Sequence, residues 1–504
     1  MQKKPAHKRN MTTEAPKPNP DFHPVSGINY AEYRSELADK YASPELKRIW
    51  SPQNRWRKAR DVWVAVAEVQ SEIGIVSQEE VDDLKAHIDE IDVYTINKRE
   101  TDEKFPGYTG HDVMAARSQY ADVAKKGGRI LHLGLTSEDI LSNVEVLLMR
   151  ESFDLLENRL ETALGSFADK ILQYKDLVGA GYTHLQNAEP VTQGLRLATY
   201  ARDLLDDLNA VRTFRDDLKA KGIKGPVGTY GSVTNSLSGS GISAREFEKR
   251  VMEKLGIEAE RITAQTYPRK TMLEAVHRAA QIGATAHKFG NDVKILQSTH
   301  FDEWAEPRNS NDQGSSAMPF KRNPRHSEQV KGVARGEPGR YVEAWQTTAE
   351  VTLERGLEDS SGKRNFLPDS IIIAEHNLRR MNVIVSGLVV RENVIRRNFR
   401  NFAWQAGGSI VLSELPKLGA DRQRIYDIIH DASNVVVDEY RENGGAPMER
   451  MVELVSGSEY VAGFATPDEI RVLFERVYEE VGEASEVCED FVVNDIYPAI
   501  GRTS

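Results

Sequence analysis

The chain has 504 residues, a formal net charge of −11, and hydrophobic residues at 39% of its positions. This length suffices for two to four domains, and the acidic balance argues against a nucleic-acid surface, which needs clustered lysine and arginine. No apolar run approaches the length of a membrane span, and the N-terminus lacks the apolar stretch of a signal peptide. The single cysteine, Cys488, cannot form an internal disulfide. We therefore expect a cytoplasmic protein that binds neither nucleic acid nor membrane.

Residues 1–27 are rich in lysine, arginine and proline and carry almost no apolar anchor, which predicts a flexible N-terminal extension. A helix is predicted from Ser51-Pro52, with Ser51 as its cap and tryptophans and alanines following at helical spacing. A second helix is predicted from Ser77, since Ser77 and Glu80 form a capping-box pattern.

Two long amphipathic segments follow, at residues 155–172 and 272–296, each with one continuous apolar stripe. The chain shows no alternation of strand and helix, so we predict an all-α fold with a long central helical bundle. The pattern leaves room for a few short strands or hairpins, with residues 224–232 as one candidate. Beyond residue 391 the helical pattern shortens, with turns expected at Gly407-Gly408 and at Leu418 to Asp421. The predicted domains are residues 28–135, 136–390 and 391–504.

Polar clusters interrupt these helices. They read GHDVMAAR (110–117), HLGLTSEDILSN (132–143), YTHLQNAEPVTQG (182–194), GSSAMPFKRNPRHSE (314–328) and LERGLEDSSGKRNFLPDS (353–370). The fourth holds glycine, serines and prolines, which predict a cationic loop from Gly314 to Glu328. Taken singly, each cluster is weak evidence, because an isolated His132 or His184 is more often structural, and Thr136-Ser137 is typical of a helix cap.

Cofactor motifs are missing from the sequence. Gly225, Gly228 and Gly231 are not preceded by an apolar strand, so they do not form a dinucleotide fingerprint, and no phosphate-loop pattern occurs. His111-Asp112 lacks further histidines at the spacing of a metal-dependent phosphohydrolase. We therefore expect neither a cofactor nor a metal.

The combination and order of these clusters resemble the fumarase and aspartase superfamily, which carries Thr-Ser, then Thr-His or Ser-His, then the loop SSxMPxKxN on a helical core. Within it, the sequence is most similar to the adenylosuccinate lyase family, on RSELADKYASPE (34–45), GHDVMA (110–115), AQTYPRK (264–270) and ERGLEDSSGKR (354–364). The resemblance implies elimination of fumarate from a succinylated nucleotide, without a cofactor, by a homotetramer whose active sites are each assembled from three chains.

The resemblance also implies residue roles. Ser315 matches the family's general base, with Lys321 stabilising its alkoxide; His184 matches the general acid, and Glu328 the carboxylate that orients it. His111 falls on a position that is both catalytic and ligand-binding. The other matched substrate-binding positions are Lys40, Tyr41, Asp112, Thr136, Ser137, Gln265, Ser316, Asn323, Arg355, Ser360 and Arg364, in addition to Lys321.

One position departs from the family pattern: Lys40 stands before Tyr41 where the family usually has arginine, which keeps the charge and loses the bidentate fork. Two alternatives stay open. The first is another lyase or cycloisomerase of the superfamily, of the argininosuccinate or carboxymuconate type. The second is a non-catalytic structural paralogue, against which the presence of Ser315, Lys321, His184 and Glu328 argues.

Overall fold

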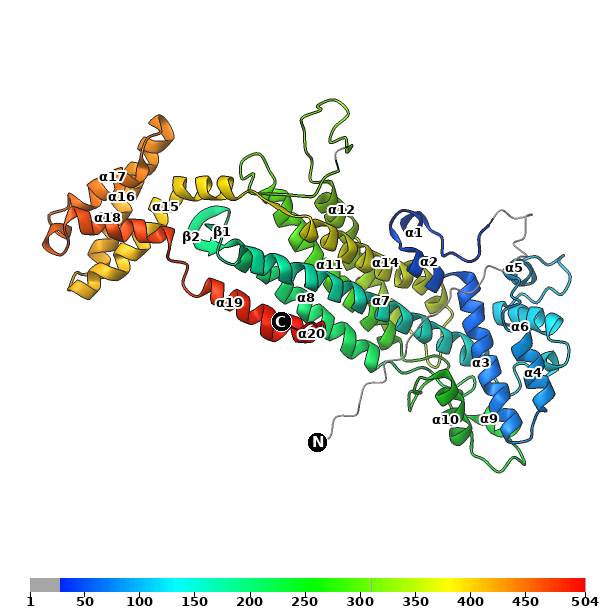
Figure 1. Ribbon diagram of the computed structural model, residues 1–504. Coiled ribbons are helices and arrows are strands. Elements are labelled where there is room, and N and C mark those ends of the chain that lie inside the picture. Colours follow the sequence, from blue (N-terminus) through cyan, green and yellow to red (C-terminus); the bar gives the residue numbers. More distant parts are fainter. Residues whose placement is uncertain (1–27, 310, 504) are drawn as a thin grey trace. The chain divides into compact units, whose positions relative to one another are not determined.

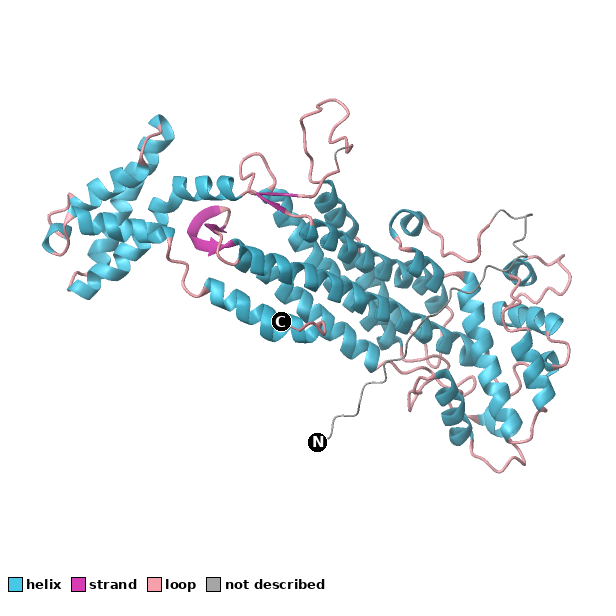
Figure 2. Ribbon diagram, in the orientation of Figure 1, coloured by secondary structure: helices cyan, strands magenta, loops and turns pink. Residues whose placement is uncertain are grey.

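The structure is a computed structural model, and it describes residues 28–309 and 311–503. The extension expected at residues 1–27 lies outside the described residues. Helices make up nearly all of the regular structure, beside two small two-stranded sheets in the described part (Figures 1 and 2). The all-α prediction is confirmed. No described helix is both long enough and apolar enough to cross a membrane.

The chain forms two compact units. The first holds the described residues up to 154 together with 214–276 and 340–372; the second holds 155–213, 277–339 and the described residues from 373 onwards. Three long helices, α7 (Ser137–Tyr174), α11 (Arg269–Leu296) and α14 (Glu358–Ser386), contribute residues to both units. The predicted division at residues 28–135, 136–390 and 391–504 stays a prediction.

The first unit contains mostly short helices. They are α1 (Glu36–Tyr41), α2 (Pro44–Ile49), α3 (Pro52–Glu72), α4 (Gln78–Ala86), α5 (Val93–Thr101), α6 (Asp112–Val123), η1 (Gly127–Arg129), α9 (Gly231–Ser236), α10 (Ala244–Leu255) and most of α13 (Glu337–Ala349). The predicted caps are confirmed: Ser51 Oγ accepts from the Asn54 amide, and Ser77 and Glu80 form the capping box. These caps fix where α3 and α4 begin.

The second unit is built around long helices whose apolar stripes meet. On α7 the predicted stripe from Leu156 to Ile171 is fully buried. Phe289 of α11 packs edge-on against Phe167 of α7 and against Tyr200 of α8 (Gln193–Asp216), with ring centroids 5.3 and 5.2 Å apart. The predicted helical bundle is therefore present within this unit.

A hairpin of β1 (Val178–Thr183) and β2 (Gln186–Thr192) precedes α8 (Figure 2). His184 and Leu185 form its two-residue tip, and both have positive φ, 55° and 59°, as a type I′ turn requires. Ala180 of β1 packs against Phe399 and Ala403. The strands expected near residues 224–232 are absent; that segment is a loop leading into α9, because three glycines there remove the side chains that would hold a strand. The other strands are β3 (Trp304–Ala305) and β4 (Val389–Val390).

Shorter helices complete the second unit. They are α12 (Arg325–Ala334), α15 (Glu392–Glu414), η2 (Leu415–Leu418), α16 (Arg422–Asn443), α17 (Pro447–Ser456), η3 (Val461–Gly463), α18 (Pro467–Glu475), η4 (Arg476–Tyr478), α19 (Ala484–Phe491), the π-helical turn Val492–Ile496 and α20 (Tyr497–Ala499). The turn predicted at 418–421 is confirmed, with Gly419 at φ +98°.

The turn predicted at Gly407-Gly408 is wrong, because both residues lie inside α15. A Cβ on Gly407 would stand 2.7 Å from Cδ1 of Phe474, so this glycine lets α18 approach α15 closely. Tertiary packing explains the glycine pair here, and the sequence signal was misread as a turn.

Candidate active site

The signature loop presents Ser315 on a scaffold of backbone amides. Ser315 Oγ accepts hydrogen bonds from the amides of Met318 at 3.1 Å and Ala317 at 3.3 Å. Donors aimed at a hydroxyl oxygen stabilise negative charge on it, and so favour its deprotonated form. The loop can therefore support the base that the sequence assigns to Ser315.

The same loop folds back on itself at its ends. Asn323 Nδ2 donates to the Gly314 carbonyl at 3.0 Å, and a Cβ on Gly314 would lie 1.9 Å from the Lys321 carbonyl oxygen. Only glycine fits there, so Gly314 sets the closure of the loop. Ser316, which follows Ser315, and Lys321, six residues after Ser315, are both exposed.

The predicted loop boundary needs a correction. The segment is irregular from Gly314 to Pro324, but α12 begins at Arg325, so Glu328 lies in the first turn of a helix. Proline restricts the residue before it and is tolerated just outside a helix start, which is why the irregular part ends at Pro324.

His184 is held at the exposed tip of the hairpin, in the left-handed region that residues other than glycine seldom adopt. Backbone strain of this kind concentrates at functional sites. Glu328 pairs with Lys294 at 3.1 Å, and among the described residues it makes no hydrogen bond to His184. The orientation of His184 by Glu328 thus stays a prediction.

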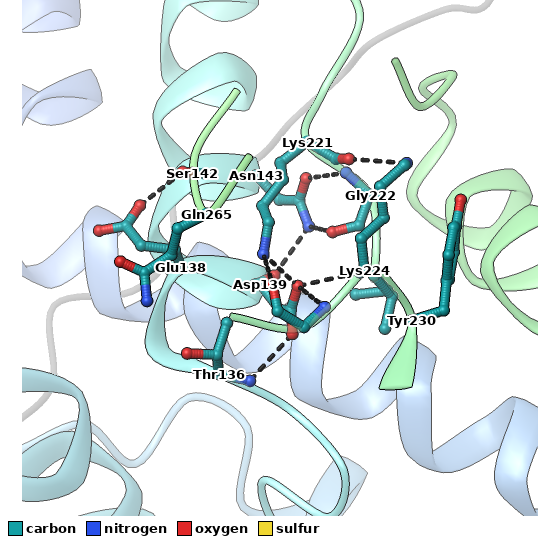
Figure 3. A network of polar contacts seen from close by, with 12 residues as sticks. Thr136, Glu138, Asp139, Ser142, Asn143, Lys221, Gly222, Lys224, Tyr230 and Gln265 are labelled. Carbon is teal, nitrogen blue, oxygen red and sulfur yellow. Dashed lines mark hydrogen bonds and ion pairs between the residues drawn. The ribbon is translucent and has the colours of Figure 1, made fainter. Parts of the chain in front are cut away.

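In the first unit, Thr136 and Ser137 stand at the start of α7, as their capping pattern predicts. The Thr136 amide donates to Asp139 Oδ2 at 2.9 Å (Figure 3). Asp139 Oδ1 in turn accepts from the amides of Lys224 and Gly225, both at 3.1 Å, and pairs with the buried ammonium of Lys221. One carboxylate therefore fixes the Thr136-Ser137 segment to the loop at 221–225.

Arg355 and Gln265 converge on the first turn of α7. Arg355 Nη2 lies 2.8 Å from Glu138 Oε1, and Arg355 Nη1 donates to Gln265 Oε1 at 3.2 Å. Glu138 is fully buried and also accepts from Ser142 (Figure 3). The structure thus brings Gln265 and Arg355 together beside the Thr136-Ser137 pair.

His111 caps α6: its Nδ1 accepts from the Val113 amide at 3.2 Å, and Asp112 is the first helical residue. Asp112 and Arg364 line a cavity of about 290 Å³ that belongs entirely to the first unit. Ser360 lies one helical turn before Arg364 on α14. Lys40 and Tyr41, in the last turn of α1, do not line this cavity.

The cavity contains charged residues that the sequence analysis missed. Arg55, Glu100, Glu145 and Lys363 line it among aromatic and aliphatic side chains such as Trp50 and Trp56. Arg55 was overlooked because Trp56 and Ala59 marked α3 as a core helix, and a charge beside such a stripe normally faces solvent. The signal for Arg55 was its place in the first turn, directly before a buried tryptophan.

His132, a weak candidate in the sequence, has a structural role. Its Nδ1 accepts from the Trp63 indole at 3.3 Å, and burial lowers the pKa of His132 to about 4. The imidazole is therefore neutral near pH 7. Among the described residues, no group of three or more His, Cys, Asp or Glu side chains is arranged to hold a metal ion.

Comparison with known proteins identifies the family of the chain. A family model described as "Lyase" matches residues 38–337. The adenylosuccinate lyase of Schizosaccharomyces pombe is 30% identical, covering 94% of this chain and 96% of that protein, and that of Archaeoglobus fulgidus is 31% identical, covering 78% and 85%.

Solved structures show the same fold. A 3-carboxy-cis,cis-muconate lactonizing enzyme from Pseudomonas putida has a TM-score of 0.78 at 22% identity, covering 92% of this chain and 100% of that chain. A fumarate lyase from Mesorhizobium sp. BNC1 has a TM-score of 0.75 at 20% identity, covering 93% and 99%. From the family match and the relatives that align along most of its length, the chain belongs to the lyase family and, within it, to the adenylosuccinate lyases.

Proposed function

We propose that this enzyme eliminates fumarate from adenylosuccinate to give AMP, and from the succinylated aminoimidazole carboxamide ribotide, as a carbon–nitrogen lyase of purine biosynthesis. The observation that carries the mechanism is the pair of backbone amides, from Ala317 and Met318, that donate to Ser315 Oγ. They supply part of what a serine hydroxyl needs to act as a base.

The reaction begins with removal of a weakly acidic carbon proton next to a carboxylate. Ser315 takes this proton as an alkoxide, which the two amides stabilise, and we assign to the cationic side chain of Lys321 a share in the same stabilisation. The carbanion is held as an aci-carboxylate by hydrogen-bond donors of the site, among which we assign Ser316 and Asn323.

His184 then protonates the departing nitrogen while the carbon–nitrogen bond breaks, releasing fumarate and AMP. A carboxylate beside an imidazole raises the imidazole pKa toward the working pH, the role we assign to Glu328. Because Glu328 contacts Lys294 in the single chain, we place the Glu328–His184 contact between chains of a homotetramer whose sites are each assembled from three chains. We also propose that the enzyme works in the cytoplasm.

The other matched residues hold the nucleotide. We assign substrate contacts to His111, Asp112, Thr136, Ser137, Gln265, Arg355, Ser360 and Arg364, and, at the end of α1, to Lys40 and Tyr41. Arg355 is already oriented by Glu138 and Gln265, so it offers a preset guanidinium fork to a phosphate or carboxylate.

A direct assay tests the proposal. The purified protein is incubated with adenylosuccinate, AMP formation is followed by nucleotide absorbance, and fumarate is measured in the same sample. One mole of fumarate should appear for each mole of AMP. If the protein converts argininosuccinate or carboxymuconate and leaves adenylosuccinate unchanged, the converted compound is the substrate and the proposed one is wrong. Inactivity toward all of these compounds would favour a structural paralogue and remove the proposal.

A further inference from the structure

We propose that Arg55 and Arg364 form a two-arginine subsite for the phosphate group of the nucleotide, with Arg55 as a further substrate-binding residue. The inference deepens the proposed function and rests on it. It concerns the cavity of about 290 Å³ in the first unit, which both arginines line.

The two guanidinium groups face one carboxylate without binding it closely. Arg55 Nη2 lies 3.8 Å from Asp112 Oδ2, and Arg364 Nη2 lies 3.9 Å from the same oxygen. Neither distance is a hydrogen bond. Within the described part of the chain, the Arg55 guanidinium makes no hydrogen bond, although its side chain is only 32% exposed. Its donors are therefore available to a ligand.

The nearby charges leave these two arginines undercompensated. Glu145 is engaged elsewhere, by Lys363 Nζ at 2.8 Å and Arg269 Nη1 at 3.6 Å. Burial and the neighbouring Asp112 raise the pKa of Glu100, which favours its neutral form. Burial and the like charge of Arg364 also lower the pKa of Arg55. An anion between the two guanidinium groups would relieve this repulsion.

A phosphate is the anion that fits this arrangement. It carries up to two negative charges on one centre and several oxygens, so it can accept from two forks at once, whereas one carboxylate, as Asp112 shows, does not bring both arginines into hydrogen-bond range. The cavity volume is close to the lower limit of ordinary ligand sites. Trp50 and Trp56 form part of the cavity wall, and apolar surroundings of this kind strengthen ionic contacts.

The test compares ligands that differ only in the phosphate. Arg55→Gln and Arg55→Lys are assayed with adenylosuccinate, with AMP and inorganic phosphate as inhibitors, and with adenosine as the ligand without phosphate. Arg57→Gln is the matched control, since Arg57 is on the same helix and its guanidinium pairs with Asp61 and Asp89. Circular dichroism and gel filtration establish that each variant is folded and assembled.

We expect Arg55→Gln to raise KM for adenylosuccinate and Ki for AMP by about tenfold to a hundredfold, the effect of one hydrogen bond to a charged group. Ki for adenosine and kcat should change little, Arg55→Lys should recover part of the loss, and Arg57→Gln should behave like the wild type. Equal losses for AMP and adenosine, or no loss for either, would overturn the subsite.

The subsite can also be judged apart from the proposed reaction. If the wild type fails to cleave adenylosuccinate, titration calorimetry with AMP, adenosine and inorganic phosphate still measures binding to the wild type and to Arg55→Gln. Selective weakening of AMP and phosphate would support the subsite even then, and unchanged affinities would refute it.

Discussion

Lys221 and Asp139 form an ion pair in which both side chains are fully buried. Asp139 also accepts hydrogen bonds from the backbone amides of Thr136, Lys224 and Gly225, so the same carboxylate that pairs with Lys221 ties the Thr136-Ser137 segment to the loop at 221–225. Burial lowers the pKa of Lys221, which Asp139 opposes. The Thr136-Ser137 segment, to which we assign substrate contacts, therefore depends on a charge pair that has no access to water.

Asp139→Asn should destabilise the protein strongly. It removes the only charge that pairs with the Lys221 ammonium in the described structure, and an unpaired buried charge costs about 3–5 kcal/mol. Urea unfolding of the assembled enzyme measures the change. Glu258→Gln is the control, because the Lys219–Glu258 pair is exposed and its loss should have no measurable effect. A loss below about 1 kcal/mol for Asp139→Asn would contradict this interpretation of the pair.

Ser315→Ala and His184→Ala should each lower kcat by about a hundredfold to ten-thousandfold, the usual contribution of a general base or acid. Steady-state kinetics give kcat, and gel filtration checks that the assembly is unchanged. Ser413→Ala is a matched control, since Ser413 is exposed and, among the residues that the structure describes, its hydroxyl donates only to the Ser409 carbonyl. Near-normal turnover in either variant would show that the replaced residue is not the general base or general acid that we propose.

Gly407→Ala should destabilise the packing of α15 on α18. The added Cβ would lie 2.7 Å from Phe474 Cδ1 and 2.9 Å from its carbonyl oxygen, and overpacking of this kind costs about 1–3 kcal/mol. Thermal unfolding compares it with Gly463→Ala, where a Cβ meets no atom within 4 Å. If both variants melt at the same temperature, Gly407 is not the close contact between these helices.

The Asp207 carboxyl gives stability a pH dependence. Burial raises its pKa to about 7 in the folded state, while Thr285 donates a 2.8 Å hydrogen bond to it. The unfolded chain loses this proton near pH 4, so between about pH 4 and 7 the folded state binds more protons. The stability contributed by Asp207 is thus fully present below pH 4 and is lost as the pH rises through 7.

Asp207→Asn keeps the shape and removes this titration. Relative to the wild type, the variant should gain stability progressively from pH 5 to pH 8, as measured by urea unfolding at each pH. Asp203→Asn, at an exposed position on the same helix, should show a much smaller pH-dependent difference. A constant difference between Asp207→Asn and the wild type at all pH values would refute the raised pKa.

The sequence predicted what local patterns determine. The caps at Ser51 and Ser77 and the apolar stripe of α7 depend on nearest neighbours and helical period, and all are confirmed. The strands at 178–192 were missed because Tyr182 to Gly194 was interpreted as a polar cluster only. Gly407 was misread because its reason is a contact with Phe474, which is 67 positions away in sequence, and no local pattern reports such a contact.

In the candidate site, too, some residues were predicted from the sequence and others are recognised only in the folded chain. Ser315 and His184 were predicted through a resemblance in order and motif, and the hydrogen bonds that Ser315 accepts are compatible with the role that we propose for it. No role was assigned to Arg55 or Asp139 from the sequence. Asp139 matters because distant segments supply its partners, and Arg55 matters because its guanidinium has no hydrogen-bond partner in the described structure. Charge compensation is a property of the folded chain and leaves no trace in local composition.

At the tip of the β1–β2 hairpin, the residues that would make the turn most stable differ from the residue that the proposed reaction needs. A type I′ turn suits Asn-Gly, and His184-Leu185 occupies it at a penalty of about 1–2 kcal/mol for each left-handed residue. Replacement of the tip by Asn-Gly would give a more stable hairpin that has lost His184, the general acid that we propose. Selection for heat resistance alone would therefore replace these two residues and give a well-folded protein without activity.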